Sequence, residues 1–122
     1  VCQMDLLASL SALIGQTYSD KVDSQNTLPV FLGKGGNGRK ELVLEGYFNY
    51  ALRDGDWVMI PPYPDTYGEA AFAGNSNCYQ LYNVKEDIGQ QVNLAEKEPK
   101  RLRQMMMTFE RLKRETGKIT NF

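Results

Sequence analysis

The sequence predicts an α+β fold with a small antiparallel sheet of about four strands. A long C-terminal helix is predicted to pack across one face of this sheet, and another helix is predicted at the N-terminus. Three observations predict this fold. Apolar residues recur at helical spacing near both ends of the chain, and short strand-like runs fill the middle. Asp54-Gly55 separates two of those runs, as a hairpin turn does. A chain of 122 residues is long enough for one such domain.

The first predicted element is a helix over residues 3–14. Leu6, Leu10 and Leu13 fall on one stripe of this helix, and Gly15 is a suitable stop. Asp5 lies in the first turn, where an acidic side chain interacts favourably with the helix dipole. The apolar arc is wide for a surface helix. We therefore expect the rest of the chain, a missing domain or a second copy to cover it.

A polar loop over 16–27 and one helical turn over 28–33 lead to the segment GKGGNG at 33–38. Its glycine spacing approximates both a dinucleotide-binding turn and a P-loop, but each of those motifs opens a helix, and here a strand is predicted to follow. We interpret the segment as a solvent-exposed, poorly ordered corner. A backbone nest that holds phosphate or sulfate beside Lys34 and Arg39 is the alternative.

Four strand-like runs follow, at 41–46, 49–53, 56–60 and 78–84. Asp-Gly at the second junction favours a type I′ turn, which requires positive φ at both central residues. The prolines after Ile60 end the third strand, so residues 61–77 are predicted to form a long loop, and 85–91 a turn.

The last predicted helix begins at Pro99 and ends at Gly117. It has one apolar stripe, formed by Leu102, Met105, Met106, Phe109 and Leu112, and we predict that this stripe belongs to the core. Between residues 97 and 118, eight basic residues outnumber three acidic ones. We interpret them as a solvated helix face on an acidic body, the alternatives being contact with nucleic acid or with an anionic membrane.

The composition excludes several kinds of catalytic site. The chain has no histidine, which removes Ser-His and Cys-His nucleophile pairs, and its two cysteines, Cys2 and Cys78, make neither a disulfide scaffold nor a zinc site. The spacing of the carboxylates along the chain does not single out any pair for general acid–base catalysis. The sequence therefore predicts no catalytic residue, metal ligand or cofactor-binding residue within this chain.

Five residues are candidates for binding an anionic or polar substrate. The cations are Lys34, Arg39 and Arg53, and the amides are Asn75 and Asn77 in the predicted 61–77 loop, where they are placed to hydrogen-bond a sugar. A plain loop role is the interpretation we prefer for Asn75 and Asn77, as a solvent-exposed corner is for the segment that holds Lys34.

Several segments together resemble the formylglycine-dependent (type I) sulfatases. LYNVKEDIGQQVNLAEKEP at 81–99 is similar to the C-terminal signature of that family, although Ile88 and Gln90 replace its usual Pro and Glu. YALRDGDWVMI at 50–60 resembles the family hairpin A-x-R-x-G-x-W-K-x-I, with Val58 at the common Lys position. QMDLLASLSALIG at 3–15 and LPVFLGKGGNGRKELVLEG at 28–46 resemble two further segments, in the family order.

This resemblance implies that the chain is the C-terminal part of an arylsulfatase-like enzyme. Residues 1–27 would be a helix and linker at the junction with a missing catalytic domain, and residues 28–122 would be the C-terminal α+β domain. The missing domain would supply the formylglycine, made within a C/S-x-P-x-R motif that neither cysteine here fits, and the calcium site. The resemblance further implies a bacterial parent enzyme that is periplasmic or secreted.

The functional prediction follows from the residues and from the family resemblance together. The parent would hydrolyse sulfate esters, whereas this chain alone would be inactive. Its role would be to complete the fold of the parent or to form part of the rim of the substrate site. An independent module that binds anions or sulfated glycans is the alternative. We expect the missing catalytic domain as partner and self-association through the helix at 4–14, and we expect no nucleic acid or membrane partner.

Overall fold

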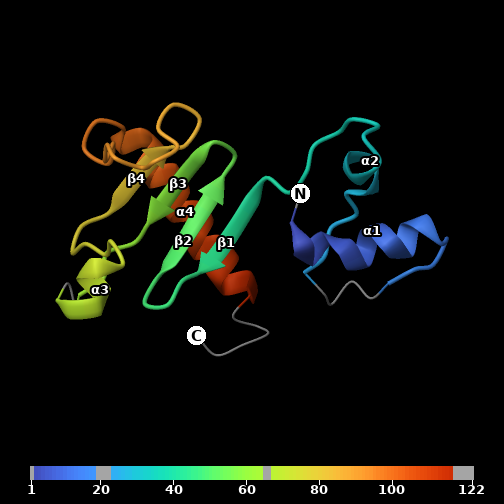
Figure 1. The fold of residues 1–122 in the computed structure, drawn as a ribbon, viewed down its shortest axis with the longest axis horizontal. Coiled ribbons are helices and arrows are strands. Elements are labelled where there is room, and N and C mark those ends of the chain that lie inside the picture. Colours follow the sequence, from blue (N-terminus) through green and yellow to red (C-terminus); the bar gives the residue numbers. More distant parts are fainter. Residues whose placement is uncertain (1, 19–22, 65–66, 117–122) are drawn as a thin grey trace. The chain divides into compact units, whose positions relative to one another are not determined.

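A computed structural model describes residues 2–18, 23–64 and 67–116 of the chain. The chain forms two units, Val1–Lys40 and Glu41–Phe122, which are described separately here (Figure 1). Residues 28–40 thus share a unit with the N-terminal helix. The predicted boundary between residues 27 and 28 concerns the domains of the parent enzyme and stays a prediction.

Unit 1 contains a short 3₁₀ helix, Gln3–Asp5, followed by helix α1, Leu6–Leu13, and the helical turn α2, Leu28–Phe31 (Figure 1). These elements agree with the predicted helix over 3–14 and the predicted turn over 28–33. The described part of the connection between α1 and α2 has no helix or strand, as the polar composition of 16–27 predicts.

Helix α1 packs within unit 1 through a small polar side. Ala8 and Ser9 are buried there, and the Ala8 N–H donates to Ser24 Oγ at 3.0 Å. The Thr27 N–H donates to Ser9 Oγ at 2.9 Å. The Ala8 N–H belongs to the first helical turn, where backbone donors have no acceptor within the helix. Ser24 therefore satisfies a donor of α1 and fastens the following segment to it.

The apolar side of α1 is exposed within unit 1. Its large side chains are Leu7, Leu10, Leu13 and Ile14, and each of them is more than half exposed. An apolar surface of this size on a helix usually marks a contact with another protein surface. The expectation that the rest of this chain covers the stripe is therefore not met within unit 1.

Unit 2 is built on an antiparallel sheet in the order β1-β2-β3-β4 (Figure 1). The strands are β1, Glu41–Glu45; β2, Tyr50–Asp54; β3, Trp57–Ile60; and β4, Gln80–Asn83. All four predicted strands exist, and the fold class is confirmed. Side chains alternate between the two faces of a strand, so the register places Val43, Leu52, Met59 and Leu81 in one row across the sheet.

The hairpin between β2 and β3 is present, but its turn differs from the prediction. Asp54 pairs with Trp57, so Gly55 and Asp56 are the two central residues. Gly55 has φ 59°, and Asp56 is absent from the positive-φ residues of the described chain. Positive φ at the first central position alone is the pattern of a type II′ turn, so the predicted type I′ turn is wrong. Glycine takes this position because it has no Cβ to clash at positive φ.

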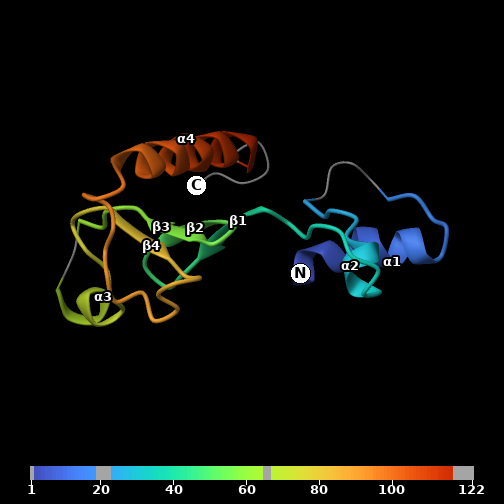
Figure 2. The ribbon, with the colours of Figure 1, turned by 90° about the horizontal axis from the view of Figure 1, so that it is seen from above.

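Helix α4, Pro99–Thr116, covers one face of the sheet in unit 2 (Figure 2). Its Met105 is fully buried against Leu52, Met59 and Leu81. The other residues of its predicted apolar stripe, Leu102, Met106, Phe109 and Leu112, pack around this core. The stripe is thus confirmed as core. The predicted helix end at Gly117 lies outside the described residues.

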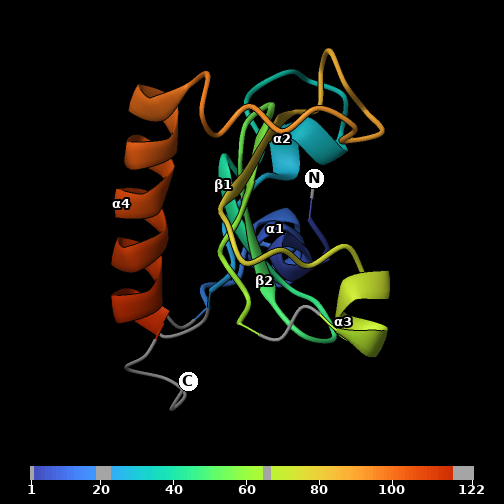
Figure 3. The same cartoon turned by 90° about the vertical axis from the view of Figure 1, so that its left-hand side faces the viewer.

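A short helix, α3, Gly68–Phe72, lies within the segment that was predicted to be a loop. That prediction is wrong for these five residues. Figure 3 shows α3 on the opposite side of the sheet from α4. Ala70 is buried, while Phe72 is almost fully exposed. Two alanines, which favour helix, sit in this turn among prolines and glycines, and these breakers concealed it from sequence periodicity.

Within residues 2–18, 23–64 and 67–116, no helix combines the length and apolar character that crossing a bilayer requires.

Candidate functional site

The five candidate binding residues belong to different units. Lys34 and Arg39 lie in unit 1, whereas Arg53, Asn75 and Asn77 lie in unit 2. Their roles as substrate contacts stay a prediction.

Lys34 lies in the glycine-rich corner, which is exposed from Phe31 to Asn37. The Gly33 N–H donates to Val30 O at 3.1 Å, and the Lys34 N–H donates to Pro29 O at 2.8 Å. With φ 66° at Gly33, these two bonds form the Schellman motif that ends α2. The first glycine of GKGGNG is thus a helix cap, and the strand β1 follows at Glu41, as predicted.

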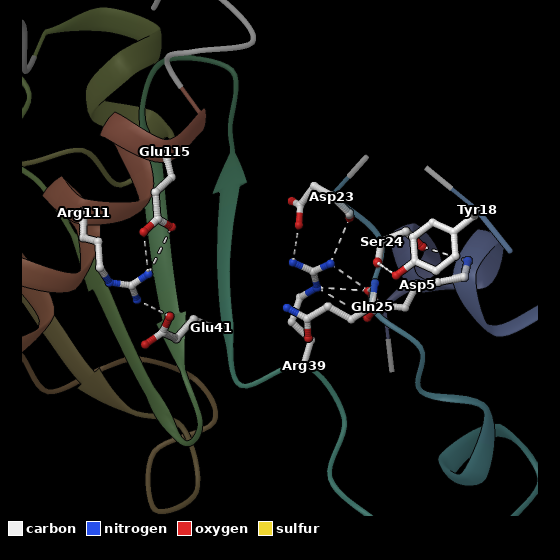
Figure 4. A network of polar contacts seen from close by, with 10 residues as sticks. Asp5, Tyr18, Asp23, Ser24, Gln25, Arg39, Glu41, Arg111 and Glu115 are labelled. Atoms are coloured by element: carbon white, nitrogen blue, oxygen red, sulfur yellow. Dashed lines mark hydrogen bonds and ion pairs between the residues drawn. The ribbon is translucent and has the colours of Figure 1, made fainter. Parts of the chain in front are cut away.

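Arg39 is held by a nearly buried ion-pair network in unit 1 (Figure 4). Its Nη2 lies 2.7 Å from Asp5 Oδ1, and its Nη1 lies 2.8 Å from Asp23 Oδ1. The side chain of Asp5 is 0% exposed and that of Arg39 only 7%. Arg39 Nη2 also donates to the Asp23 carbonyl at 2.9 Å. The guanidinium fork of Arg39 is therefore engaged with carboxylates of its own unit.

The pKa values follow this arrangement. Burial alone would raise the pKa of Asp5, but hydrogen bonds from Arg39 and from the Gln25 N–H, together with the charge of Arg39, outweigh burial and lower it. Burial would likewise lower the pKa of Arg39, and its bonds to Asp5 and Asp23 raise it instead. Both groups of the pair are thus charged at neutral pH.

Sequence reasoning missed the role of Asp5. A helix-dipole role explained an acid in the first turn, whereas the structure buries the carboxylate as a hub that accepts from Arg39 and from the Gln25 N–H at 3.0 Å. The partners are separated by 34 positions along the chain. No local pattern marks such a pair, because its cause is tertiary burial of both charges.

Arg53 lies on β2 with its side chain exposed. Its neighbour Leu52 faces α4, so Arg53 projects from the opposite face of the sheet. Its Nε donates to Gly55 O at 3.0 Å, which fastens the hairpin turn. Arg53 therefore has both a local structural role and a solvent-facing position.

The two candidate asparagines follow α3. Asn75 Nδ2 donates to Ala70 O at 3.1 Å, so this side chain satisfies a carbonyl of the helix end. Asn77 is exposed, and its Oδ1 lies 3.3 Å from Cys78 Sγ. Of these two residues, Asn77 has the more open position for a ligand.

Two arginines fasten α4 to the sheet in unit 2. Arg101 Nη2 lies 3.2 Å from Asp54 Oδ2, and the Arg101 guanidinium carbon lies 5.5 Å from the centre of the Trp57 ring. Arg111 pairs with Glu41 on β1 and with Glu115 at 3.1 Å (Figure 4). The pKa of Arg111 is raised, first by its hydrogen bond to Glu41. Two of the basic residues of α4 therefore hold this helix against the sheet. This agrees with the interpretation that the basic helix complements an acidic body.

The segment 81–99, which resembles the sulfatase signature, begins within the edge strand β4, and Asn93 in its later part folds back onto that strand. Asn93 Oδ1 accepts from the Leu81 N–H at 3.0 Å and from the Ala95 N–H at 3.0 Å, and its Nδ2 donates to Tyr79 O at 3.1 Å. Asp87 Oδ2 accepts from the Val92 N–H at 2.8 Å. The polar residues of the motif therefore close a loop and pair with a strand.

The described residues do not fit a sulfatase metal site. Within residues 2–18, 23–64 and 67–116, no group of three or more His, Cys, Asp and Glu side chains is placed to hold a metal ion. Neither cysteine lies in a C/S-x-P-x-R motif. No catalytic step through calcium or formylglycine is therefore assigned to this chain.

No protein-family model matches the chain. An N-acetylgalactosamine-6-O-sulfatase of Bacteroides thetaiotaomicron is 31% identical over 117 residues, which cover 91% of this chain and 23% of that protein. A solved 6S-sulfatase structure from Bacteroides thetaiotaomicron, reported with the metabolism of multiple glycosaminoglycans, superposes with a TM-score of 0.78 at 29% identity. The superposition covers 89% of this chain and 24% of the sulfatase chain.

The chain matches a sulfatase C-terminal domain. This sulfatase-type domain spans about a quarter of the length of the sulfatases it matches. A third protein, Ps i-CgsB, shares the fold alone, with a TM-score of 0.63 at 17% identity over 88% of this chain and 23% of its own. The sequence resemblance is thus confirmed by an independent structural likeness.

The sulfatase-type motifs have structural explanations in this chain. Leu81 of the signature is in the core, Asn93 pairs with β4, and Gly55 of the hairpin motif takes the turn position with positive φ. These motifs are typical of the fold because their residues form its turns and pair its strands. None of the motif residues is thereby assigned a part in catalysis.

Proposed function

We propose that this chain is the non-catalytic C-terminal part of an arylsulfatase-like enzyme that hydrolyses sulfate esters of a glycan. The observation that carries the proposal is the match to sulfatases along 91% of the chain but only 23% of the sulfatase. That relative is an N-acetylgalactosamine-6-O-sulfatase, which supports a sulfated hexosamine as substrate class. Formylglycine and calcium would belong to the remaining three-quarters of the parent enzyme.

The role of the chain in that enzyme would be structural closure. Helix α1 exposes an aliphatic surface of Leu7, Leu10, Leu13 and Ile14, and unit 1 itself leaves this surface uncovered. Aliphatic side chains of this kind are stabilised by burial against another protein surface, by about 25 cal/mol per Å² of apolar area. We infer that the catalytic domain covers α1 in the parent.

A first experiment tests the inactivity of the chain. The purified chain is incubated with an aryl sulfate and with N-acetylgalactosamine 6-sulfate, and its intact mass is measured for formylglycine. We expect neither turnover nor the modified residue. Turnover by the pure chain would falsify this part of the proposal, and a parent coding sequence without a C/S-x-P-x-R motif would refute the sulfatase parentage.

A second experiment tests the closure role in the parent enzyme. Leu10→Asp in α1 should lower the yield of folded parent, because it places a charge in the inferred interface. Met107→Asp is the matched control, since Met107 on α4 is also largely exposed but belongs to a solvated helix face. Equal behaviour of the two variants would contradict the inferred cover of α1.

The second candidate function is an independent module that binds anions or sulfated glycans. The exposed cations Lys34 and Arg53 favour it, whereas Arg39 is engaged with Asp5 and Asp23. Binding of sulfated glycans on an array, abolished by added salt and by Lys34→Ala or Arg53→Ala, would support this function. No binding at millimolar glycan would exclude it.

A further inference from the structure

Three segments meet at one end of the sheet in unit 2: residues 46–49, 61–64 and 67–78. Asn49 Nδ2 donates to Pro61 O at 2.8 Å, and the Tyr63 N–H donates to Ser76 O at 2.8 Å. Figure 3 shows the turn between β1 and β2 beside α3, on the side of the sheet away from α4. We call these segments the aromatic end.

The aromatic end exposes rings almost completely. Tyr47 is 86% exposed, Tyr67 is 84% exposed and Phe72 is 96% exposed. Aromatic side chains of this size gain most from being covered, so their nearly complete exposure indicates a binding surface.

The exposed Tyr47 ring is supported from within. Its centroid lies 4.5 Å from that of Phe48 in an edge-to-face arrangement, and Phe48 lies 6.2 Å from Tyr63. Edge-to-face pairs of this kind are favourable beyond the area they bury. Tyr47 is thus presented to solvent by ring contacts that restrict its orientation before any ligand binds.

The chemistry of this surface differs from that of α1. Every exposed large apolar side chain of the aromatic end is an aromatic ring, whereas α1 exposes leucines, with Ile14 directly after them. Among the described residues of the aromatic end, Glu69 is the single charged side chain, and the segment 67–78 also contains the exposed amide Asn77. Aliphatic surface suits a protein partner. Flat rings with amides beside them suit the C–H faces and hydroxyl groups of a pyranose.

We propose that the aromatic end is a subsite for the uncharged pyranose faces of a glycan, with rings stacked on Tyr47 and Phe72 and with Asn77 placed to hydrogen-bond hydroxyl or acetamido groups. The proposal rests on the proposed function for its choice of glycan, because the sulfatase relative is named for a hexosamine. Since cations are absent from the described residues of this surface, recognition there is independent of sulfate.

The test uses the 122-residue chain and two hexasaccharides, chondroitin 6-sulfate and its desulfated form, titrated by ¹H–¹⁵N NMR at low and high salt. We expect both hexasaccharides to bind with similar affinity at both salt concentrations. Tyr47→Ala and Phe72→Ala should each weaken binding at least fivefold. Met107→Ala, which truncates an exposed apolar side chain on the other side of the sheet, should leave binding unchanged.

Each result separates this subsite from the proposed function. Absence of shifts with either sugar, or binding that needs sulfate and vanishes in salt, overturns the subsite. Protection of the Tyr47 and Phe72 amide regions by the catalytic domain in the parent also overturns it, because that surface would then be a protein interface. Hydrolysis of a small aryl sulfate by the parent tests the proposed function alone, since that substrate has no pyranose ring.

Discussion

The buried pair between Asp5 and Arg39 provides the sharpest test of how unit 1 is held together. Asp5→Asn keeps the shape of the side chain and removes its charge. The side chain of Asp5 is 0% exposed and that of Arg39 is 7% exposed. The substitution therefore leaves the guanidinium charge of Arg39 with little access to water. Breaking a buried pair by removing one partner costs about 3–5 kcal/mol. Unit 1 should therefore lose most of its resistance to local opening.

The matched control is Asp23→Asn, which acts on the same guanidinium. The side chain of Asp23 is 59% exposed, and an exposed ion pair contributes about 0–1 kcal/mol. The Asp23 carbonyl would still accept from Arg39 Nη2. Asp23→Asn should therefore have a small effect beside that of Asp5→Asn.

Hydrogen exchange read by NMR measures both effects. The reporters are the Ala8, Gln25 and Thr27 amides, which donate to side chains in unit 1. Asp5→Asn should accelerate their exchange by about two to four orders of magnitude, whereas Asp23→Asn should accelerate it by less than about tenfold. Equal acceleration by the two variants would refute the argument that burial sets the strength of the pair.

The same pair predicts a dependence on pH. The pKa of Asp5 is lowered in the folded chain, so the pair stabilises unit 1 above the ordinary carboxyl pKa of about 3.9. This stability is lost as pH falls through the lower, folded pKa. Protection of the Gln25 amide should persist at pH 5 and disappear in stronger acid, and the acid transition should be absent in Asp5→Asn.

Three further predictions concern packing, the signature segment and the exposed helix. Met105→Ala should destabilise unit 2 by about 2–5 kcal/mol in urea unfolding followed by Trp57 fluorescence, while Met107→Ala, at an exposed position, should change it by less than about 0.5 kcal/mol. Asn93→Ala removes three hydrogen bonds to the backbone and should cost about 2 kcal/mol by the same assay, and an unchanged free energy of unfolding would contradict this expectation. The isolated chain should self-associate through α1, and Leu10→Glu should restore a monomer in light scattering; a wild-type monomer at high concentration would contradict this expectation.

The order and type of most elements could be predicted from sequence. The four strand-like runs and the apolar stripe of helix α4 could be predicted, whereas the row of Leu52, Met59 and Leu81 under Met105 depends on the strand register that the structure gives. The turn at Gly55 was placed correctly but assigned to the wrong type, because the sequence does not say which of two neighbouring pairs closes the hairpin. Helix α3 escaped prediction because five residues are too few to establish a helical period.

The candidate site was less accessible to sequence reasoning. Arg39 was chosen for its position beside a glycine-rich segment, and the structure places it in a pair with Asp5 instead. Sequence reasoning singled out neither Tyr47 nor Phe72, and the structure exposes both. Charge and aromatic character are visible in a sequence, but the burial that gives them a role is not.

By itself, the sequence determined the fold class, the family resemblance and the absence of histidine chemistry, because these depend on residue type, spacing and order along the chain. Only the tertiary structure decided which side of α1 is packed within its unit, with Ala8 and Ser9 buried and Leu10 exposed. It also decided that GKGGNG begins with a helix cap and that Asp5 holds Arg39. The physical reason is that burial and ion pairing join residues distant along the chain, and their free energies depend on what surrounds each group in space.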